Sequence, residues 1–331
     1  MNARTADSTV APNKAAAWMA GIALALGSSL AAAQNWPTKQ IRIVIPFPPS
    51  GPTDFTGRLL AQKLSEQTGQ PAIVDNKVGG GTVVGTDFVA KSAPDGHTIL
   101  MMPVQVAIVP SLYEKLPYDL LRDLTGITQL TNQPYLLVAH PATPYRTVPE
   151  LIAHAKANPE RVRFASSGIG GGNHLAFELF NKMAGTKITH VPYKGAAPAL
   201  NDLIGGQVEV YMPNPITSFQ HVKSGKLRAI ATTGAKRVSQ LPDLPSVAET
   251  LPGFDAGVWF GLYVPSATPR DTVRRIYGET QKVLQDPAVR KNMTADGGDI
   301  IGSTPEEFAA FMKREVAKWA EIVKFSGATA E

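Results

Sequence analysis

Two turns rich in proline, glycine and serine contain the residue types that bind anions through the backbone. The first reads PFPPSGPTD (46–54); it follows a β-branched run and precedes apolar residues at helical spacing. A helix that begins at Thr53-Asp54 directs its free N–H groups and the positive end of its dipole toward this turn, and Gly51 permits unusual dihedrals. The stretch therefore predicts a site for a carboxylate or a phosphate. For Asp54, capping of the helix is an alternative role.

The second turn reads SSGIGGGNH (166–174) and again lies between a predicted strand and a predicted helix. Its glycines come close to the dinucleotide fingerprint GxGxxG/A, but the last position is Asn173 and no acidic residue follows about twenty residues later. A second backbone anion site, with the Ser166 and Ser167 hydroxyls as additional donors, fits these residues better than a Rossmann site.

The usual catalytic signatures are missing from the sequence. The phosphate loop GxxxxGK[ST] and the nucleophile elbow GxSxG do not occur, and the six histidines show no HxxH, HxxxH or HExxH spacing. We therefore expect no metal site, no cofactor and no enzymatic activity. A Ser167–His174–Asp set assembled in space is a weaker alternative that no spacing supports.

Residues 1–33 have the pattern of a secretory signal peptide. Arg4 and Lys14 give a basic start, a stretch of small and aliphatic residues follows, and Ala31-Ala32-Ala33 fits a small-x-small cleavage site. We expect cleavage before Gln34 and export to the periplasm, with an uncleaved membrane anchor as the alternative. The chain contains no cysteine, which excludes a cysteine-linked lipid anchor and any disulfide.

Charge gives little information about partners. The 331-residue chain carries a formal net charge of +5, and its basic residues are scattered rather than clustered. We therefore expect no nucleic-acid partner, and the mild positive balance favours acidic small ligands only weakly.

Strand-like and helix-like segments alternate along the chain, which predicts an α/β fold with mainly parallel sheets. The predicted strands are 41–47, 72–77, 98–103, 135–140, 162–167, 209–214, 227–233 and 261–266. The predicted helices are 55–69, 148–159, 173–185, 197–206, 218–225, 271–286 and 304–327. The last helix begins with a capping box, Thr304-Pro305-Glu306-Glu307.

Two long strand-like segments, 126–140 and 256–266, stand on either side of the middle of the chain. A chain that leaves one lobe, builds a second and returns gives a two-lobed protein with two crossover strands. We expect lobe 1 to comprise residues 34–133 and 259–331, and lobe 2 to comprise 134–258. A small ligand between the lobes would be buried when they close.

The chain resembles the extracytoplasmic substrate-binding proteins of tripartite tricarboxylate transporters, the Bug or TctC-like receptors. Matching stretches run from Trp36 to the C-terminus and include WPTKQIRIVIPFPPSGPTD, APDGHTIL, TVPELIAHAKANP, SSGIGGGNHLAFELF and HVPYKGAAPALNDLIGGQVE. The resemblance implies a monomeric periplasmic binding protein of the type II-like Venus-flytrap fold. It also implies a small organic carboxylate as ligand and delivery to a membrane permease with a large and a small subunit.

Carried over position by position, the resemblance places two loops and two further residues at the ligand. They are Ser50, Gly51, Thr53 and Asp54 in the first loop, Ser166, Ser167, Gly170, Gly171, Asn173 and His174 in the second, and Tyr193 and Asn214 beside them. Two positions depart from the family pattern near the expected pocket. Ser50 stands where the family usually has a second glycine, and Asn214 stands where an acidic residue is frequent.

These observations favour a periplasmic receptor for a mono-, di- or tricarboxylate, aromatic acids included. The alternatives are an exported α/β hydrolase or oxidoreductase, and a ligand sensor of the same fold. Neither loop contains arginine, and Lys194 is the nearest basic side chain in the motifs. We therefore expect the backbone to hold the anion, and a branched side chain at Gly51 or Gly171 to close dihedrals and space that the ligand needs.

Overall fold

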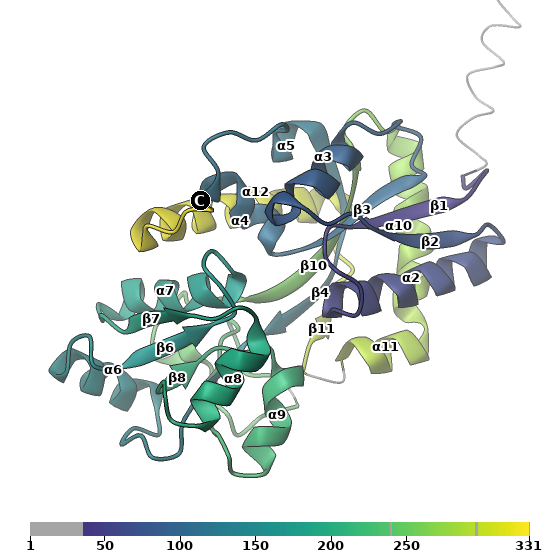
Figure 1. Ribbon diagram of the computed structural model, residues 1–331. Coiled ribbons are helices and arrows are strands. Elements are labelled where there is room, and N and C mark those ends of the chain that lie inside the picture. The colour runs from purple at the N-terminus through teal and green to yellow at the C-terminus, as the bar shows by residue number, and fades with distance from the viewer. Residues whose placement is uncertain (1–35, 239, 295–296, 331) are drawn as a thin grey trace, which may run out of the picture.

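The structure is a computed structural model that describes residues 36–238, 240–294 and 297–330. The predicted signal segment, residues 1–33, lies outside this range. Two β-sheets, each flanked by helices, form two lobes (Figure 1). Among the described residues, no helix is both long and apolar enough to cross a membrane.

The first lobe is built on a six-stranded sheet. Its strands are β1 (Ile41–Ile45), β2 (Ala72–Asn76), β3 (Thr98–Pro103), β4 (Leu124–Pro134), β10 (Gly257–Pro265) and β11 (Asp299–Ile300), in the order β11-β4-β10-β3-β1-β2. Its helices are α2 (Pro52–Thr68), η1 (Gly80–Thr82), α3 (Val83–Ala90), α4 (Gln105–Leu112), α5 (Leu120–Asp123), α10 (Arg270–Gln285), α11 (Pro287–Thr294) and α12 (Pro305–Ser326).

The second lobe is built on a five-stranded sheet. Its strands are β5 (Leu136–Ala139), β6 (Arg163–Ser166), β7 (Thr189–Pro192), β8 (Val210–Tyr211) and β9 (Arg228–Thr232), in the order β7-β6-β8-β5-β9. Its helices are α6 (Val148–Ala157), α7 (Gly172–Ala184), α8 (Ala196–Ile204), α9 (Pro215–Lys223) and η2 (Val247–Glu249).

Strand direction differs from the expectation of mainly parallel sheets. β1 pairs in parallel with β2 and β3, and β6 pairs in parallel with β7 and β8. In contrast, β10 is antiparallel to β3 and β4, β11 is antiparallel to β4, and β5 is antiparallel to β8 and β9. The reason is the path of the chain: β4 leads out of lobe 1 and β10 leads back, so the two run in opposite directions.

The two crossings of the chain lie side by side. The predicted strand 126–140 divides at Tyr135, because β4 belongs to the first sheet and β5 to the second. The Tyr135 N–H donates to the Thr233 hydroxyl at 2.7 Å, and that hydroxyl donates to the Ala256 carbonyl at 2.6 Å. The two-lobed α/β fold with two crossover strands is thus confirmed, whereas the predicted division at residues 134 and 258 remains a prediction.

The hydrophobic residues of β1 explain why helices cover both faces of the first sheet. Ile41, Ile43 and Ile45 of β1 share a core cluster with residues of α2 and α10, whereas Val44 belongs to the cluster on the opposite face. All four side chains are fully buried. Successive side chains of a strand point to opposite faces, so a run of β-branched residues fits a strand with helices on both sides.

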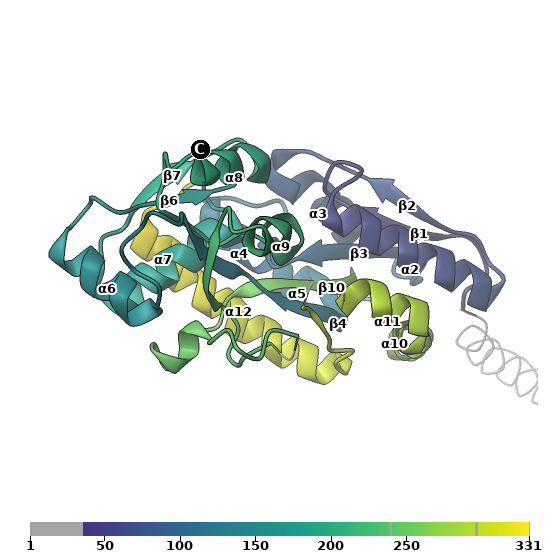
Figure 2. The ribbon, with the colours of Figure 1, turned by 90° about the horizontal axis from the view of Figure 1, so that it is seen from below.

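Helix α12 packs against both lobes (Figures 1 and 2). Near its start, Phe308 lies over Gly126 and Gly261, where a Cβ atom at either glycine would collide with the ring. Farther along, Trp319 joins a hydrophobic cluster that includes Phe177 of α7. A single core therefore extends from the first sheet, beneath α12, into the second lobe.

A buried carboxylate anchors the middle of α12. Glu315 is 5% exposed, and its Oε2 accepts hydrogen bonds from the indole N–H groups of Trp259 at 2.8 Å and Trp319 at 2.9 Å. Lys318 forms an ion pair with its other oxygen. Since hydrogen bonds to a charged acceptor are the stronger kind, Glu315 fixes the position of the helix on β10.

We predict that Glu315→Leu lowers the free energy of unfolding by about 2–4 kcal/mol, because two buried indole N–H groups lose their acceptor. The matched control is Glu321→Leu on the same helix, whose carboxylate is 74% exposed and pairs with Lys182 at 3.0 Å. Removing that surface pair should cost about 0.5 kcal/mol or less. Urea unfolding of both variants checks this, and equal losses would contradict the anchoring role.

Candidate functional site

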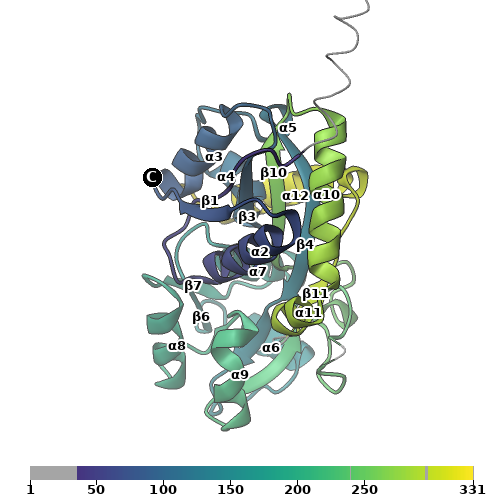
Figure 3. The ribbon, with the colours of Figure 1, turned by 90° about the vertical axis from the view of Figure 1, so that its right-hand side faces the viewer.

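The first predicted loop leads into a helix N-terminus that no side chain caps. Gly51 is the N-cap residue of α2, with φ −87° and ψ 170°, and Pro52 occupies the first turn. Figures 1 and 3 show this end of α2 on the side of lobe 1 that faces lobe 2. The first N–H groups of α2 are therefore free of a side-chain partner, as an anion site requires.

Asp54 holds this loop together. Its Oδ2 accepts from the Ser50 N–H at 3.0 Å and from Arg58 Nε at 2.8 Å, and its Oδ1 accepts from Asn76 Nδ2 at 2.9 Å. The Arg58 hydrogen bond is the main reason that the pKa of Asp54 falls to about 2. Both oxygens are engaged and only 3% of the residue is exposed, so the carboxylate stabilises the loop from its buried side.

Ser50 has the left-handed backbone conformation, with φ 71°. A residue with a side chain adopts this region at a cost of roughly 1 kcal/mol, whereas glycine adopts it freely. The hydrogen bond to Asp54 fixes the Ser50 N–H in this conformation. The structure thus gives a reason for the glycine usual at this position in the family that the sequence resembles.

The predicted need for glycine dihedrals at Gly51 and Gly171 is wrong. Both have negative φ values, −87° and −68°, that any residue can adopt. A Cβ atom at Gly51 would meet only the Pro48 carbonyl, at 3.8 Å, whereas one at Gly171 would lie 3.2 Å from the Gly168 carbonyl. Positive φ values occur instead at Gly168 and at Gly170, with φ 144° and 71°.

The second predicted loop leads into α7, whose N-cap residue, Gly171, likewise provides no side-chain cap. The Ser167 hydroxyl donates to Asn173 Oδ1 at 3.1 Å, and Asn173 Nδ2 donates to the Tyr211 hydroxyl at 3.0 Å. Burial raises the pKa of Tyr211 above its usual range, so its hydroxyl stays neutral. Asn173 therefore ties the loop to β8.

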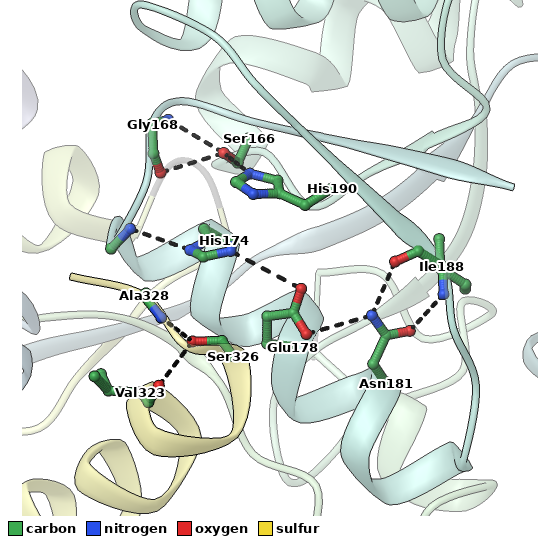
Figure 4. A network of polar contacts seen from close by, with 11 residues as sticks. Ser166, Gly168, His174, Glu178, Asn181, Ile188, His190, Val323, Ser326 and Ala328 are labelled. Atoms are coloured by element: carbon green, nitrogen blue, oxygen red, sulfur yellow. Dashed lines mark hydrogen bonds and ion pairs between the residues drawn. The ribbon is translucent and has the colours of Figure 1, made fainter. Parts of the chain in front are cut away.

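Two stacked histidines support the second loop from inside the lobe (Figure 4). Their ring centroids are 3.8 Å apart; His174 Nδ1 accepts from the Gly170 N–H at 3.1 Å, and His190 Nε2 lies 2.6 Å from the Ser166 hydroxyl. Burial lowers the pKa of His174 to about 3, with a further contribution from the neighbouring His190, and burial lowers the pKa of His190 to about 4. Both rings are therefore neutral near pH ~7.

The contacts of the second loop argue against a hydrolytic triad. Ser167 bonds to Asn173, and His174 Nε2 faces Glu178 at 3.9 Å, so the Ser167–His174–Asp arrangement is not formed. The close serine–histidine pair is Ser166 with His190, and sequence reasoning did not include His190 among the site residues. Ser166 is 0% exposed, which leaves its hydroxyl inaccessible to a substrate.

The last two predicted residues have partners of their own. The Tyr193 hydroxyl donates to Asp202 at 2.8 Å, while the Tyr193 N–H donates to the Ser166 carbonyl at 3.1 Å. Asn214 Nδ2 donates to Gln133 Oε1 at 2.9 Å, which connects the end of β8 to the end of β4. Tyr193 therefore lies beside the second loop through its backbone, and Asn214 lies near the crossover between the lobes.

The structure groups the predicted residues into two sets, one in each lobe. Ser50, Gly51, Thr53 and Asp54 form the first set, and the second comprises the serine, glycine, asparagine and histidine residues of 166–174 with Tyr193. Within residues 36–238, 240–294 and 297–330, no hydrogen bond or ion pair joins the two sets. The same part of the chain holds no group of three or more histidine, aspartate or glutamate side chains arranged for a metal ion.

Residues 56–327 match the family described as tripartite tricarboxylate transporter family receptor, TctC. The chain is similar to Protein BugT of Bordetella pertussis, with 36% identity over 299 residues, 89% of this chain and 92% of that protein.

Solved structures give the same assignment. An R. palustris protein solved with adipate has a TM-score of 0.76 and 32% identity, covering 89% of this chain and 99% of that one. MatC of Rhodopseudomonas palustris, solved with bound malate, has a TM-score of 0.73 and 29% identity, covering 87% of this chain and 100% of that one. The periplasmic binding protein BugD has a TM-score of 0.73 and 34% identity, covering 89% of this chain and 99% of that one.

We predict that Asp54→Ala lowers the free energy of unfolding near pH ~7 by about 1–2 kcal/mol, a value reduced by the exposure of Arg58. The folded-state pKa of Asp54, about 2, lies below the ordinary 3.8, so this contribution is present above 3.8 and is lost as the pH falls through about 2. Urea unfolding of the variant and the parent across that range measures it. The exposed Asp271→Ala is the control; a pH-independent difference for Asp54→Ala would contradict the ionic role.

Proposed function

The chain belongs to the tripartite tricarboxylate transporter receptor family, and on that premise we propose that it binds a small organic carboxylate between its two lobes. The family and its solved members are solute-binding receptors, so the protein is a receptor and not an enzyme. The solved relatives described as a periplasmic transporter and a periplasmic binding protein support a periplasmic location.

The observation that carries the proposal is the pair of helix N-termini, one in each lobe, that no side chain caps. Each offers backbone N–H groups to an anion, and the first loop adds the side chains of Ser50 and Thr53. The Ser166 and Ser167 hydroxyls are engaged within the second loop. A hydrogen bond to a charged acceptor contributes about 1.5–3 kcal/mol, so several converging donors suffice without a salt bridge. The twelve residues predicted from the sequence stay a proposal for this site.

We further propose that the ligand is a dicarboxylate. Relatives have been solved with adipate and with malate, and both of those ligands carry two carboxylates. One carboxylate on each loop would connect the lobes, and a ligand that contacts both lobes only when they are closed stabilises the closed state. Tricarboxylates and aromatic acids fit the same loops if two of their oxygens reach both helix ends.

The biological role that we propose rests on the family assignment. Residues 1–33 would direct the chain to the periplasm, and the loaded receptor would deliver its ligand to a membrane permease with a large and a small subunit. A ligand sensor of the same fold is the second role compatible with this site. Reconstituted uptake with the candidate permease, with and without the receptor, distinguishes the two.

The direct test is a ligand screen on the mature protein. We predict that adipate or malate raises the melting temperature, because a ligand at about 100 times its dissociation constant adds roughly 2.7 kcal/mol of stability. Hexanoate, which has the length of adipate but one carboxylate, should bind this site roughly tenfold more weakly or worse. If hexanoate displaced a bound dicarboxylate as effectively as adipate does, the bridging of two loops would be wrong. If adipate, malate, citrate and aromatic acids all failed to bind, the carboxylate assignment would be wrong.

Substitutions separate backbone recognition from recognition by charge. We predict that Gly51→Val lowers the affinity for the best ligand of the screen roughly a hundredfold or more, about 2.8 kcal/mol. The methyl groups of the valine would cover the end of α2, while the backbone at this position stays unstrained. Lys194→Gln should cost about tenfold or less, near 1.4 kcal/mol. Calorimetry measures both, and circular dichroism confirms folding. Loss of binding in Lys194→Gln with retention in Gly51→Val would support a charge clamp instead.

A further inference from the structure

A cavity lies in lobe 1, away from both predicted loops. It has a volume of about 620 Å³ and lies between the start of β4, the start of α10 and the first half of α12. Its wall includes Leu124, Tyr263, Val273 and Met312, and none of the predicted ligand residues lines it. A space of this size falls in the range of roughly 300–1,000 Å³ that is typical of small-molecule sites.

The cavity has an excess of positive charge. Arg270, Arg274 and Lys313 line it, against one carboxylate, Glu306. Arg274 contacts Asp271 only at 3.5 Å. Among the described residues, Arg270 and Lys313 take part in no ion pair or side-chain hydrogen bond. Two cations beside an apolar wall are therefore available to a ligand.

The start of α10 adds further donors. Its N-cap residue is Pro269, so no side chain caps the first N–H groups of this 16-residue helix. Thr268, which also lines the cavity, is 6% exposed, and its hydroxyl is buried without a hydrogen-bond partner among the described residues. Less than 1 Å² of this hydroxyl oxygen is exposed, so a ligand oxygen or a water reaches it only if the start of α10 shifts. A hydrogen bond formed there would relieve the roughly 1–3 kcal/mol that an unsatisfied buried hydroxyl costs.

We propose that this cavity is a second binding site, for a small amphipathic acid. The acidic group would lie at the start of α10 between Arg270 and Lys313. A short apolar chain would lie against Leu121, which is 49% exposed, and over the edges of Leu124 and Met312. The lining explains why we propose an amphipathic acid. A fully polar anion would leave the apolar part of the lining exposed to water, whereas a neutral apolar molecule would leave the cations and the helix end unpaired. The site is independent of the one between the lobes.

The experiment titrates hexanoate into the mature protein labelled with ¹³C at leucine and methionine methyl groups. The Met312 and Leu124 resonances, assigned by substitution, should shift and saturate. The double variant Arg270→Gln/Lys313→Gln should weaken this binding tenfold or more. The control is Arg290→Gln, an exposed arginine of the same lobe that does not line the cavity, and it should bind as the parent does.

Three results would overturn the proposal. The first is the absence of a saturable shift at Met312 and Leu124 up to the solubility of hexanoate. The second is equal affinity of the double variant and the parent, and the third is equal affinity of hexanol and hexanoate; either of these would show that the positive charge plays no part. Because the readout is local to these methyl groups, failure here says nothing about binding between the lobes.

Discussion

The packing of α12 against both lobes is the constraint on which the rest of the structure depends. Its first turns lie on the six-stranded sheet through Phe308, and its later turns contact α4 and α7 through the cluster that contains Trp319. Close-packed interiors do not deform continuously. We infer that closure rotates the lobes about this shared core, and that the backbone change is absorbed near Tyr135 and Ala256, where the chain crosses.

The two predicted loops differ in how they pack against that core. In the second loop, a Cβ atom at Gly170 would lie 2.8 Å from Leu112 of α4, and one at Gly172 would collide with Tyr135. The second loop therefore packs on lobe 1 close to the pivot and can move little relative to it. The first loop is held by Asp54 and Asn76 of its own lobe. Rotation would thus carry one helix end toward another that stays nearly fixed.

The sequence predicts much of this architecture, and the reason is local. β1, α2, α7 and α12 are correctly predicted because their apolar periodicity and end signals lie within the segments themselves; the capping box of Thr304 and Glu307 forms as expected. α4 was missed because its eight residues are mainly apolar, with polar side chains only at Gln105 and Ser111, and include Pro110. Strand direction depends on the route between the lobes, which no local pattern encodes.

The candidate site, too, could be predicted from the sequence only in part. Both loops could be located from their composition, but the roles of their side chains could not, because these depend on distant partners. Asp54 is fixed by Asn76 and Asn173 by Tyr211, and the ring of His174 stacks on His190, a residue of another strand. The left-handed conformation of Ser50 is visible only in the folded chain, although the glycine that the resembling family usually carries there is a signal for it.

These supporting contacts also explain how the proposed anion site would tolerate a carboxylate within it. Asp54 lies in the first turn of α2, where its negative charge would repel a ligand carboxylate. Arg58 forms an ion pair with it at 2.8 Å and Ser50 and Asn76 donate to it, so the pair has no net charge. In the second loop, burial keeps both histidines neutral. Neither loop then presents a net charge, and the attraction for an anion comes from oriented N–H groups and helix dipoles. Such a field is short-ranged and directional, so the proposed site would discriminate by the position of ligand oxygens more than by total ligand charge.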